Sequence, residues 1–542
     1  MQLPRPLLWF ILLLLPFAFF VNLGVHPFID DEGNRSLVAL EMLWQNSFVT
    51  PTLHGDYYYN KPPLWNWLIA LSFSLWGSAS EWSARFPAVL SLLGFGYTIY
   101  YFVQKEWGRV KGVLVALFFL TCGRILFWES LLALIDISFS WAMFTLFMVV
   151  YQEGQKKSWR RLFLFSYLLM VVGFMFKGLP AIVFQGLTLV AYLVSIKEWK
   201  RLFSITHIAS GLLSVSLLAV YYWAYHQENS LENVFQALFV ESSKRTAVAY
   251  SVGDTLEHVV GFPLELFYHF LPWTFLPLLL FNKTYRLAAL KHPFVRYCLL
   301  IFVVNISVYW LSPNFYPRYI LMLVPLGFIV LVALIPDQWS IDDKLYLGVR
   351  WLLGLFVLVM LGAAVVTYFI EDTQSLSYLS LRSGVAVLGL LGLVWLYWKM
   401  PQAQFFIVVA GLLFFRLGFN FLALPPRAID SRSERIKTAT LAFAERWQGR
   451  DLAVFNDTHM EPAASFYLEN DLHYIVPRQR NNFTLDRDYI YNPEQYSNEL
   501  FMTPIDSFLV RHRKVTHYYV ARLKRTDSLF IEAQTIGENP GF

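Results

Sequence analysis

Long apolar runs follow one another along the chain up to about residue 425. A helix of about 17 to 25 apolar residues can cross a bilayer, and thirteen runs approach or reach that length. They cover residues 7–25, 83–103, 112–128, 132–151, 162–176, 179–195, 202–225, 259–281, 297–312, 319–336, 351–370, 384–399 and 405–424. We therefore predict an α-helical polytopic membrane protein whose transmembrane domain, residues 1–425, contains about 13 transmembrane helices.

Composition supports this class, and the loop charges predict an orientation. Hydrophobic residues make up 57% of the chain, above the roughly 45 to 50% of soluble domains. Basic clusters fall in alternate loops, which predicts that these loops and the N-terminus are cytoplasmic; the clusters lie at 105–111, 156–161, 197–201 and 283–296. We thus expect a multi-pass protein of the cell (inner) membrane, with its first long loop and its C-terminal part on the extracytoplasmic (periplasmic) face.

A second domain is predicted at residues 426–542, where apolar runs give way to a mixed sequence of nearly balanced charge. Its pattern predicts a small α/β domain, with helices at 433–448 and 462–468 and strands at 452–455, 473–476 and 516–520. It contains no glycine-rich phosphate loop and no metal-ligand spacing. We expect it to support the membrane domain or contact an acceptor, and we expect no nucleic-acid partner.

The first extracytoplasmic loop, residues 26–80, is the candidate site region. Apolar stripes at 34–45 and 64–75 predict two helices lying in the membrane interface. Asp30, Asp31 and Glu32 precede the first of them. Negative charge is favoured at a helix N-terminus, which is the structural explanation for Asp31. Carboxylates at a membrane edge are costly, however, and frequently mark functional sites.

Further charges fall at the predicted extracytoplasmic ends of later spans. They are Lys61, Asp136, Lys177, Arg245, His258 and Arg318. Because charge at a membrane edge is expensive, their occurrence on one face predicts a shared, mainly cationic pocket for an anion. Each also has a structural explanation: Lys177 or Arg318 can reach lipid headgroups, and Asp136 can pair with Lys177.

The order of these motifs resembles a known family, the GT-C glycosyltransferases that use polyprenyl-phosphate sugars. The resemblance is to the branch of lipid A aminoarabinose transferases and dolichyl-phosphate-mannose protein mannosyltransferases, and it covers roughly residues 1–425. It rests on Asp31-Glu32-Gly33, Glu41-Met42-Leu43, Tyr59-Asn60-Lys61-Pro62-Pro63-Leu64, Asp136, Lys177-Gly178, Glu257-His258, Leu271-Pro272-Trp273 and Pro317-Arg318-Tyr319.

The resemblance implies an inverting transfer of a sugar from a polyprenyl phosphate to a lipid, glycan or protein acceptor on the extracytoplasmic face. Asp31 would be the general base, and Asp136 would orient a substrate or share that role. Cations would bind and stabilise the donor phosphate: Lys61, Lys177, Arg245, His258 and Arg318. Glu32, Tyr58, Tyr59 and Asn60 would line the pocket for the donor sugar.

Two departures from the aminoarabinose enzymes limit what the resemblance implies. Those enzymes have Arg three positions after the Asp of the acidic pair, where this chain has Asn34 followed by Arg35. They also have Glu directly before Lys-Pro, where this chain has Asn60. Because that Glu belongs to the divalent-metal site suggested for the group, no cofactor is assigned, and the need for a divalent metal and the identity of the sugar stay open.

Two alternatives from other functional classes remain. A transporter or flippase for a lipid-linked glycan would also carry buried charges, although the charges here gather at one membrane face and no inverted repeat is evident. A non-catalytic membrane scaffold would need neither Asp31 nor Asp136. Tests of these two side chains therefore separate the alternatives from an enzyme.

Overall fold

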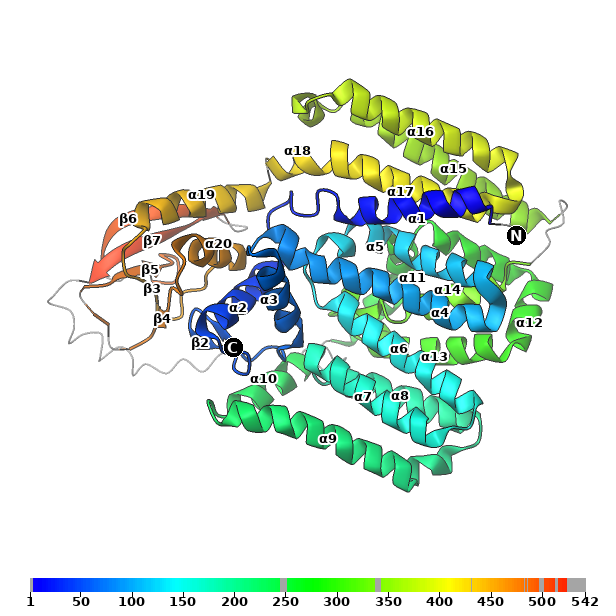
Figure 1. Cartoon of the computed structure of the whole chain (residues 1–542), viewed down its shortest axis with the longest axis horizontal. Helices are drawn as coiled ribbons and strands as arrows, with labels where there is room; N and C mark the ends of the chain where they lie inside the picture. Colours follow the sequence, from blue (N-terminus) through cyan, green and yellow to red (C-terminus); the bar gives the residue numbers. More distant parts are fainter. Residues whose placement is uncertain are drawn as a thin grey trace. The chain divides into compact units, whose positions relative to one another are not determined.

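The computed structural model describes residues 3–243, 251–336, 343–429, 431–481, 483–484, 486–496, 502–511 and 515–523. Its helices (Figure 1) are α1 Arg5–Phe20, α2 Glu32–Gln45, α3 Leu64–Trp76, α4 Glu81–Thr121, α5 Gly123–Phe127, η1 Glu129–Leu131, α6 Asp136–Gln155, α7 Trp159–Lys177, α8 Pro180–Ser195, η2 Trp199–Phe203, α9 Ile205–His226, α10 Glu232–Ser243, α11 Val252–His269, η4 Trp273–Phe281, α12 Lys283–Lys291, α13 Pro293–Trp310, η5 Pro317–Ile320, α14 Val324–Ala333, α15 Lys344–Thr367, η6 Glu371–Ser375, α16 Leu379–Lys399, η7 Pro401–Ala403, α17 Gln404–Leu422, α18 Leu424–Ile429, α19 Arg432–Trp447 and α20 Pro462–Leu472. Its strands are β1 Thr52–Leu53, β2 Asp56–Tyr57, β3 Leu452–Phe455, β4 Arg478–Gln479, β5 Asp488–Tyr491, β6 Met502–Arg511 and β7 Val515–Leu523.

The predicted apolar segments all fall on helices, as a polytopic helical protein requires. Within the described part of the chain, seven helices are long and apolar enough to cross a membrane, or eight if α11 and η4, bent by 119°, form one broken span. One of the seven, α4, holds the predicted segment 83–103 and the first part of the segment 112–128, and it is kinked at Gly108, where φ is +78°. The class is confirmed, whereas thirteen crossings and their orientation stay predictions.

Two buried polar side chains on α17 donate hydrogen bonds to backbone carbonyls of neighbouring helices. Asn420 on α17 donates to the carbonyl of Ala18 on α1, with an Nδ2 to O distance of 2.9 Å, so the two helices are tied side by side (Figure 1). Arg416, fully buried one turn earlier, donates to the carbonyl of Leu126 at the end of α5. Hydrogen bonds of this kind hold helices where the surroundings offer no water.

The C-terminal strands form a five-stranded sheet in the order β4-β3-β5-β7-β6. The pairs β3–β4 and β3–β5 are parallel, while β5–β7 and β6–β7 are antiparallel. Alternating residues of β3 lie on opposite faces of the sheet. Leu452 and Val454 pack against α19 and α20, and Ala453 and Phe455 belong to a smaller aromatic cluster. This alternation follows from the two-residue period of a strand.

The α/β prediction for this region is right in class and wrong in part. Both predicted helices and the strands at 452–455 and 516–520 are present, but β5 and β6 were not predicted. The predicted strand 473–476 is wrong, because His473 takes a left-handed conformation that ends α20. The chain therefore begins to pair with β3 only at Arg478.

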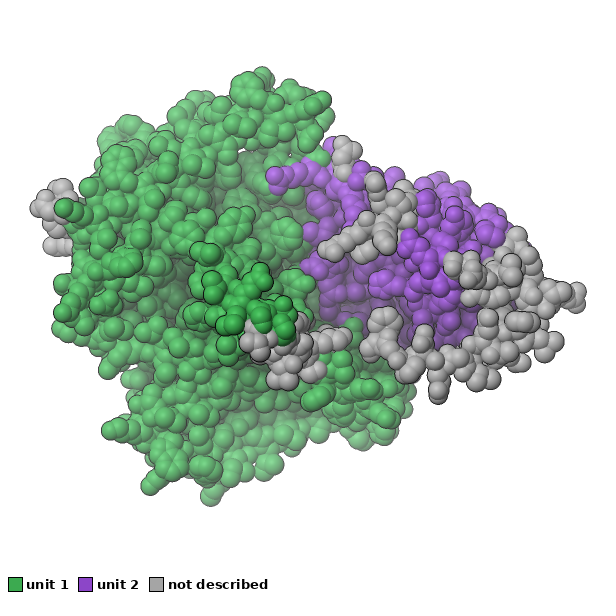
Figure 2. Space-filling model, turned by 180° about the vertical axis from the view of Figure 1, so that it is seen from behind, with its two compact units in different colours: residues 1–23, 59–65, 85–426 green, residues 24–58, 66–84, 427–542 purple. Residues whose placement is uncertain are grey.

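Two compact units divide the chain (Figure 2). Unit 1 comprises residues 1–23, 59–65 and 85–426, and unit 2 comprises residues 24–58, 66–84 and 427–542. Most of the first loop therefore folds with the C-terminal α/β domain.

Candidate active site

Asp31 lies in unit 2, immediately before α2. Its Oδ2 accepts hydrogen bonds from Nε and Nη2 of Arg35, at 3.0 and 2.5 Å, and its Oδ1 accepts one from Nδ2 of Asn34 at 3.0 Å. Arg35 also donates to the hydroxyl of Tyr58 at 2.8 Å. The Asp31 side chain is 36% exposed, whereas that of Arg35 is 5% exposed. One carboxylate is thus held in a fixed orientation at the edge of a buried polar network.

The contacts of Asp31 do not support a purely capping role. Although Asp31 is the N-cap residue of α2, its side chain makes no capping hydrogen bond. Burial opposes the charge of Arg35, but Asp31 and Tyr58 outweigh that effect and raise the pKa of Arg35 above its usual value. Arg35 therefore stays cationic beside the Asp31 side chain. Asn34 and Arg35, where this chain differs from the family pattern, hold the Asp31 carboxylate in place.

Glu32 was predicted to line the pocket for the donor sugar. It is fully buried, and its Oε2 accepts a hydrogen bond from the backbone N–H of Ile29 at 3.1 Å. This contact closes the turn that precedes α2. The neighbouring Asp30 is exposed and has a φ of +56°. Of the three adjacent carboxylates, Asp31 therefore has the best-oriented, partly exposed side chain.

Asp136, Lys177 and Arg318 come together in unit 1, as the sequence predicted for a shared pocket. Lys177 Nζ donates to Asp136 Oδ1 in a buried ion pair, and Arg318 Nε lies 3.6 Å from Asp136 Oδ2. Both cations also face the ring of Tyr319, with distances to its centroid of 4.2 Å for Lys177 and 5.9 Å for Arg318. The expected pairing of Asp136 with Lys177 is confirmed.

Helix ends favour this arrangement. Asp136 is the first residue of α6, and Lys177 is the last residue of α7. The α-helix dipole stabilises an anion at the first position and a cation at the second. Gly178 then turns the chain with a φ of +79°, which an L-residue with a side chain adopts only with strain. The end of α7 and the turn that follows it thus explain the Lys177-Gly178 motif.

Two charged residues near this cluster were not predicted. Arg124 Nε donates to Glu129 Oε1 at 2.7 Å, and the carboxylate of Glu129 interacts electrostatically with Asp136 and Arg318. Glu129 is 1% exposed, and its Oε2 has no hydrogen-bond partner among the described residues. Opposite charges five positions apart, at the end of the predicted span 112–128 and directly after it, were the available sequence signal.

The structure also describes four other residues that were predicted for the site: Tyr59, Asn60, Lys61 and His258. Lys61 is half-buried and Asn60 is exposed, and the hydroxyl of Tyr59 accepts a hydrogen bond from Asn229 at 3.1 Å. His258 Nε2 lies 3.2 Å from the carbonyl oxygen of Tyr309. Arg245 lies outside the described residues. Because Asp31, Glu32 and Tyr58 belong to unit 2 and the others to unit 1, one shared pocket stays a prediction.

A metal site is not provided by the side chains that the structure describes. In that part of the chain, no group of three or more His, Cys, Asp and Glu residues is placed to hold a metal ion. We assign no step of the chemistry to a metal.

A buried cluster of titratable groups joins α2, the β1–β2 hairpin and α20 within unit 2. Glu41 accepts hydrogen bonds from the Thr52 hydroxyl and the backbone N–H of His54, both at 2.5 Å. His54 Nε2 lies 2.9 Å from the hydroxyl of Ser465, and its Nδ1 lies 2.9 Å from Oε1 of Glu469. Burial is the main cause of all three pKa shifts: it raises the pKa of Glu41 to about 7, lowers that of His54 to about 4 and raises that of Glu469 well above its usual value.

These shifts predict how Glu41 affects stability with pH. Its pKa is 4.5 when unperturbed and about 7 in the folded chain, so between these values the folded state holds a proton that the unfolded state releases. The Glu41 contribution to stability is therefore full below pH 4.5 and is lost as the pH rises through 7. We expect the stability advantage of the native protein over Glu41→Gln to shrink between pH 5 and pH 8, measured by thermal unfolding. A constant difference would contradict the assignment.

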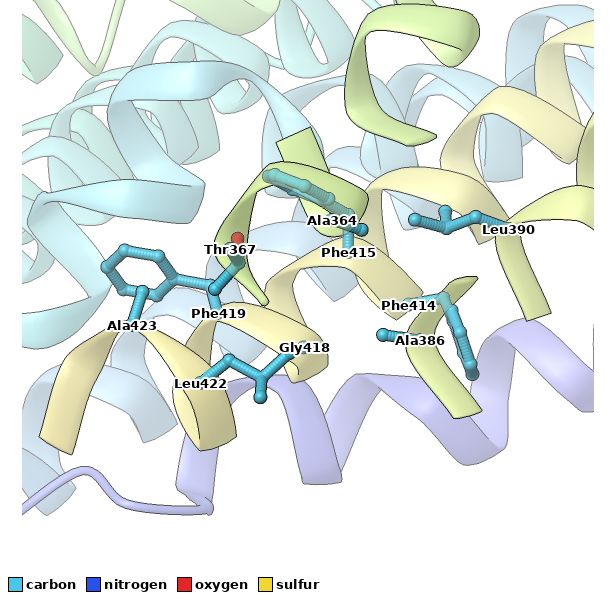
Figure 3. Close-up of a pocket in the computed structure, with 10 residues that line it drawn as sticks. All are labelled: Ala364, Thr367, Ala386, Leu390, Phe414, Phe415, Gly418, Phe419, Leu422 and Ala423. Carbon is cyan, nitrogen blue, oxygen red and sulfur yellow. The ribbon is translucent and has the colours of Figure 1, made fainter. Parts of the chain in front are cut away.

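The described helices of unit 1 leave a small and a large cavity between them. The smaller, about 40 Å³, lies between α15, α16 and α17 and is lined by Phe414, Phe419 and other apolar residues (Figure 3). The larger, about 430 Å³, lies between α11, η4, α13 and α14, and Thr274 is the one polar residue among those described as lining it. Its size falls in the range of ligand sites, and its lining suits a hydrocarbon chain.

Comparisons with known protein sequences find similarity to glycosyltransferases over part of the chain. Residues 60–225 match the family described as dolichyl-phosphate-mannose-protein mannosyltransferase, a range that contains Lys61, Asp136 and Lys177. An uncharacterized protein of Aquifex aeolicus (strain VF5) is 37% identical over 112 residues, which are 20% of this chain and 27% of that protein. The undecaprenyl phosphate-alpha-4-amino-4-deoxy-L-arabinose arabinosyl transferase 2 of Pseudomonas fluorescens (strain Pf0-1) is 24% identical over 361 residues, 65% of this chain and 63% of that protein. The chain thus spans less than two thirds of the length of these curated relatives.

A solved structure matches the fold almost from end to end. The crystal structure of ArnT from Cupriavidus metallidurans bound to undecaprenyl phosphate has a TM-score of 0.68 at 17% sequence identity, and the match covers 94% of this chain and 97% of that chain. At this identity the likeness concerns the fold. The chain thus shares the fold of this ArnT structure, and its sequence resembles the GT-C glycosyltransferases of the aminoarabinose transferase and protein mannosyltransferase branch.

Proposed function

We propose that this chain is a membrane glycosyltransferase that moves a sugar from a polyprenyl-phosphate donor to an acceptor on the extracytoplasmic face. The observation that carries the proposal is the buried charge cluster of Asp136, Lys177 and Arg318, found in a chain that shares the fold of a protein solved with undecaprenyl phosphate. The apolar cavity beside α13 and α14 is suited to part of a prenyl chain.

The charges of the unit 1 cluster suit a phosphate ligand. Arg124, Lys177 and Arg318 supply three cations, while Glu129 and Asp136 supply two carboxylates. This set carries a formal excess of one positive charge in largely apolar surroundings. Burying such charges is costly, so their presence is better explained by an anionic ligand than by stability. In this proposal Lys61, Arg245 and His258 add to the same phosphate site.

The proposed reaction has one bond-forming and one bond-breaking event at the anomeric carbon. The acceptor oxygen forms a bond to that carbon, and the bond from the carbon to the phosphate oxygen breaks, with inversion. Asp31 removes the acceptor hydroxyl proton as the new bond forms. The departing polyprenyl phosphate gains negative charge, which Lys61, Lys177 and Arg318 stabilise. Asp136 holds Lys177 and Arg318 in place.

The phosphate site is tested by binding of undecaprenyl phosphate to the purified protein in lipid nanodiscs. We expect Lys61→Ala to weaken binding about tenfold or more, because a hydrogen bond to a charged group contributes about 1.5 to 3 kcal/mol. Lys156→Ala is the matched control, since Lys156 is exposed and pairs with Glu153 at 2.8 Å. Equal losses in both variants would contradict a specific phosphate site.

A further inference from the structure

The first turn of α2, which follows Asp31, is pressed against the first turn of α20. A Cβ on Gly33 would lie 2.4 Å from the carbonyl carbon of Pro462 and 2.5 Å from the backbone nitrogen of Ala463. Such distances are far below van der Waals contact, and the opposing atoms are backbone atoms that cannot rotate away. Glycine at position 33 therefore permits a direct backbone contact between the Asp31 region and the C-terminal domain.

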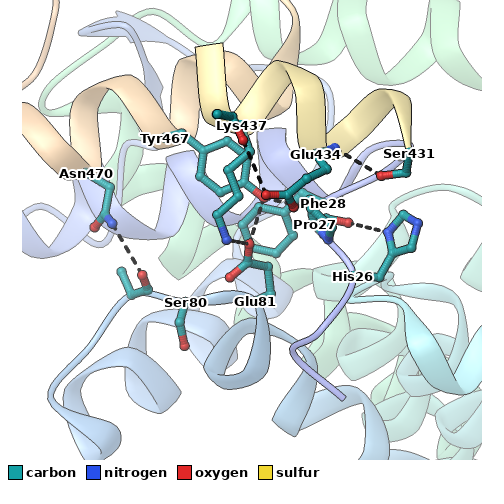
Figure 4. A network of polar contacts seen from close by, with 12 residues as sticks. His26, Pro27, Phe28, Ser80, Glu81, Ser431, Glu434, Lys437, Tyr467 and Asn470 are labelled. Atoms are coloured by element: carbon teal, nitrogen blue, oxygen red, sulfur yellow. Dashed lines mark hydrogen bonds and ion pairs between the residues drawn. The ribbon is translucent and has the colours of Figure 1, made fainter. Parts of the chain in front are cut away.

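A second contact holds the segment that leads into Asp31. The backbone N–H of Phe28 donates to the Tyr467 hydroxyl at 2.9 Å, and the two rings stack with centroids 5.8 Å apart. The same hydroxyl donates to Oε1 of Glu81 at 2.9 Å, and Lys437 Nζ lies 2.6 Å from that oxygen (Figure 4). Tyr467 thus connects the approach to Asp31 with the start of α4 and with α19.

A third contact fixes the other end of α2. Glu41 on α2 binds the β1–β2 hairpin through Thr52 and His54, and His54 reaches Ser465 on α20. The helix that follows Asp31 is therefore anchored to α20 directly at its first turn, and through the hairpin near its last turn. The segment before Asp31 and both ends of the following helix α2 are held in place. The Asp31 side chain therefore has little freedom to move.

We propose that α20 of the C-terminal domain is the positioning element for Asp31, with Gly33 and Tyr467 as positioning residues. This inference rests on the proposed function, because it assigns the geometry a role in sugar transfer. It gives the C-terminal domain a part in the chemistry although it supplies no reacting group. Displacement of a catalytic group by a fraction of an ångström to one ångström lowers rates steeply.

The inference is tested in the full-length protein with Gly33→Ala, measuring transfer from a radiolabelled polyprenyl-phosphate sugar and binding of undecaprenyl phosphate. We expect kcat to fall about tenfold or more while the KM for the donor and the binding of undecaprenyl phosphate change less than about twofold, because the phosphate cations lie elsewhere in the sequence. Tyr467→Phe keeps the ring but loses the hydroxyl, so we expect a smaller loss of kcat with the same unchanged KM.

Gly392→Ala is the matched control, since it makes the same change within α16 where a Cβ would meet no atom within 4 Å. We expect it to leave kcat unchanged. If Gly33→Ala keeps the native kcat, or loses kcat and undecaprenyl phosphate binding in proportion to the loss of folded protein, the positioning role is wrong. If the native protein shows no transfer, the proposed function itself fails. Native and Asp31→Asn proteins measured in parallel distinguish these results.

Discussion

Replacement of Asp31 by asparagine is expected to lower the rate of sugar transfer about 10²- to 10⁴-fold, the contribution of a positioned general base. Asparagine has the same shape and still accepts a hydrogen bond from Arg35, but it cannot take a proton. Because Asp31 lies outside the proposed phosphate site, the affinity for undecaprenyl phosphate should stay close to native. The measurement is the initial rate of transfer from a radiolabelled polyprenyl-phosphate sugar in proteoliposomes.

Asp30→Asn is the matched control for this prediction. It removes the same charge one residue earlier, and the left-handed conformation at position 30, with a φ of +56°, is one that asparagine tolerates well. We expect this variant to transfer sugar at nearly the native rate. Equal activity of Asp31→Asn and the native protein would show that Asp31 is not the base.

The second large effect is expected at the buried pair of Asp136 and Lys177. Asp136→Asn removes the carboxylate that faces both Lys177 and Arg318. Removing one partner of a buried pair costs about 3 to 5 kcal/mol, so we expect less folded protein and no detectable transfer. Lys177→Met should be milder for stability, since Asp136 keeps Arg318 at 3.6 Å. Heating followed by size-exclusion chromatography measures stability, and the transfer assay measures activity.

The double variant Asp136→Asn/Lys177→Met separates stability from function. Replacing a whole buried pair by neutral groups is often nearly neutral for stability, so the double variant should regain much of the folded yield lost in Asp136→Asn. It should remain inactive. Recovery of transfer together with folding would mean that the pair is only structural. Lys156→Met, at an exposed lysine, controls for the loss of a lysine as such.

Long apolar runs predicted the helical bundle because membrane-spanning helices are long and uniformly apolar. Hydrophobic periodicity predicted the C-terminal domain less well. Strand β5 was missed, since its Tyr489 and Ile490 are buried through contacts with residues that are distant in sequence. The strand predicted at 473–476 failed because the left-handed turn at His473 leaves no clear signal in hydrophobicity.

The charged residues of the candidate site were easier to predict from the sequence than the contacts that hold them in place. Asp31, Asp136, Lys177 and Arg318 stood out because charge is rare in this chain and costly at a membrane edge. The grouping of the first loop with residues 427–542 had no sequence signal. It depends on backbone contacts such as that of Gly33 with Pro462, which no local pattern records.

At Asn34 and Arg35 this chain differs from the family pattern, and the structure shows what the difference does to Asp31. The family resemblance places an arginine three residues after the Asp of the acidic pair, and this chain has asparagine there. Both Asn34 and the following Arg35 bind the Asp31 carboxylate. A helix brings residues three and four positions apart to the same face, so a shift of one position keeps an arginine within reach of Asp31.

The most direct test of glycosyl transfer follows the donor rather than the unknown acceptor. Proteoliposomes with the purified protein are mixed with a polyprenyl-phosphate sugar, labelled in the sugar, and with membranes that contain the native acceptor. Free polyprenyl phosphate and labelled product are then measured over time. We predict that both appear in equal amounts with the native protein and are nearly absent with Asp31→Asn. Movement of intact donor across the bilayer without release of polyprenyl phosphate would contradict glycosyl transfer and indicate transport.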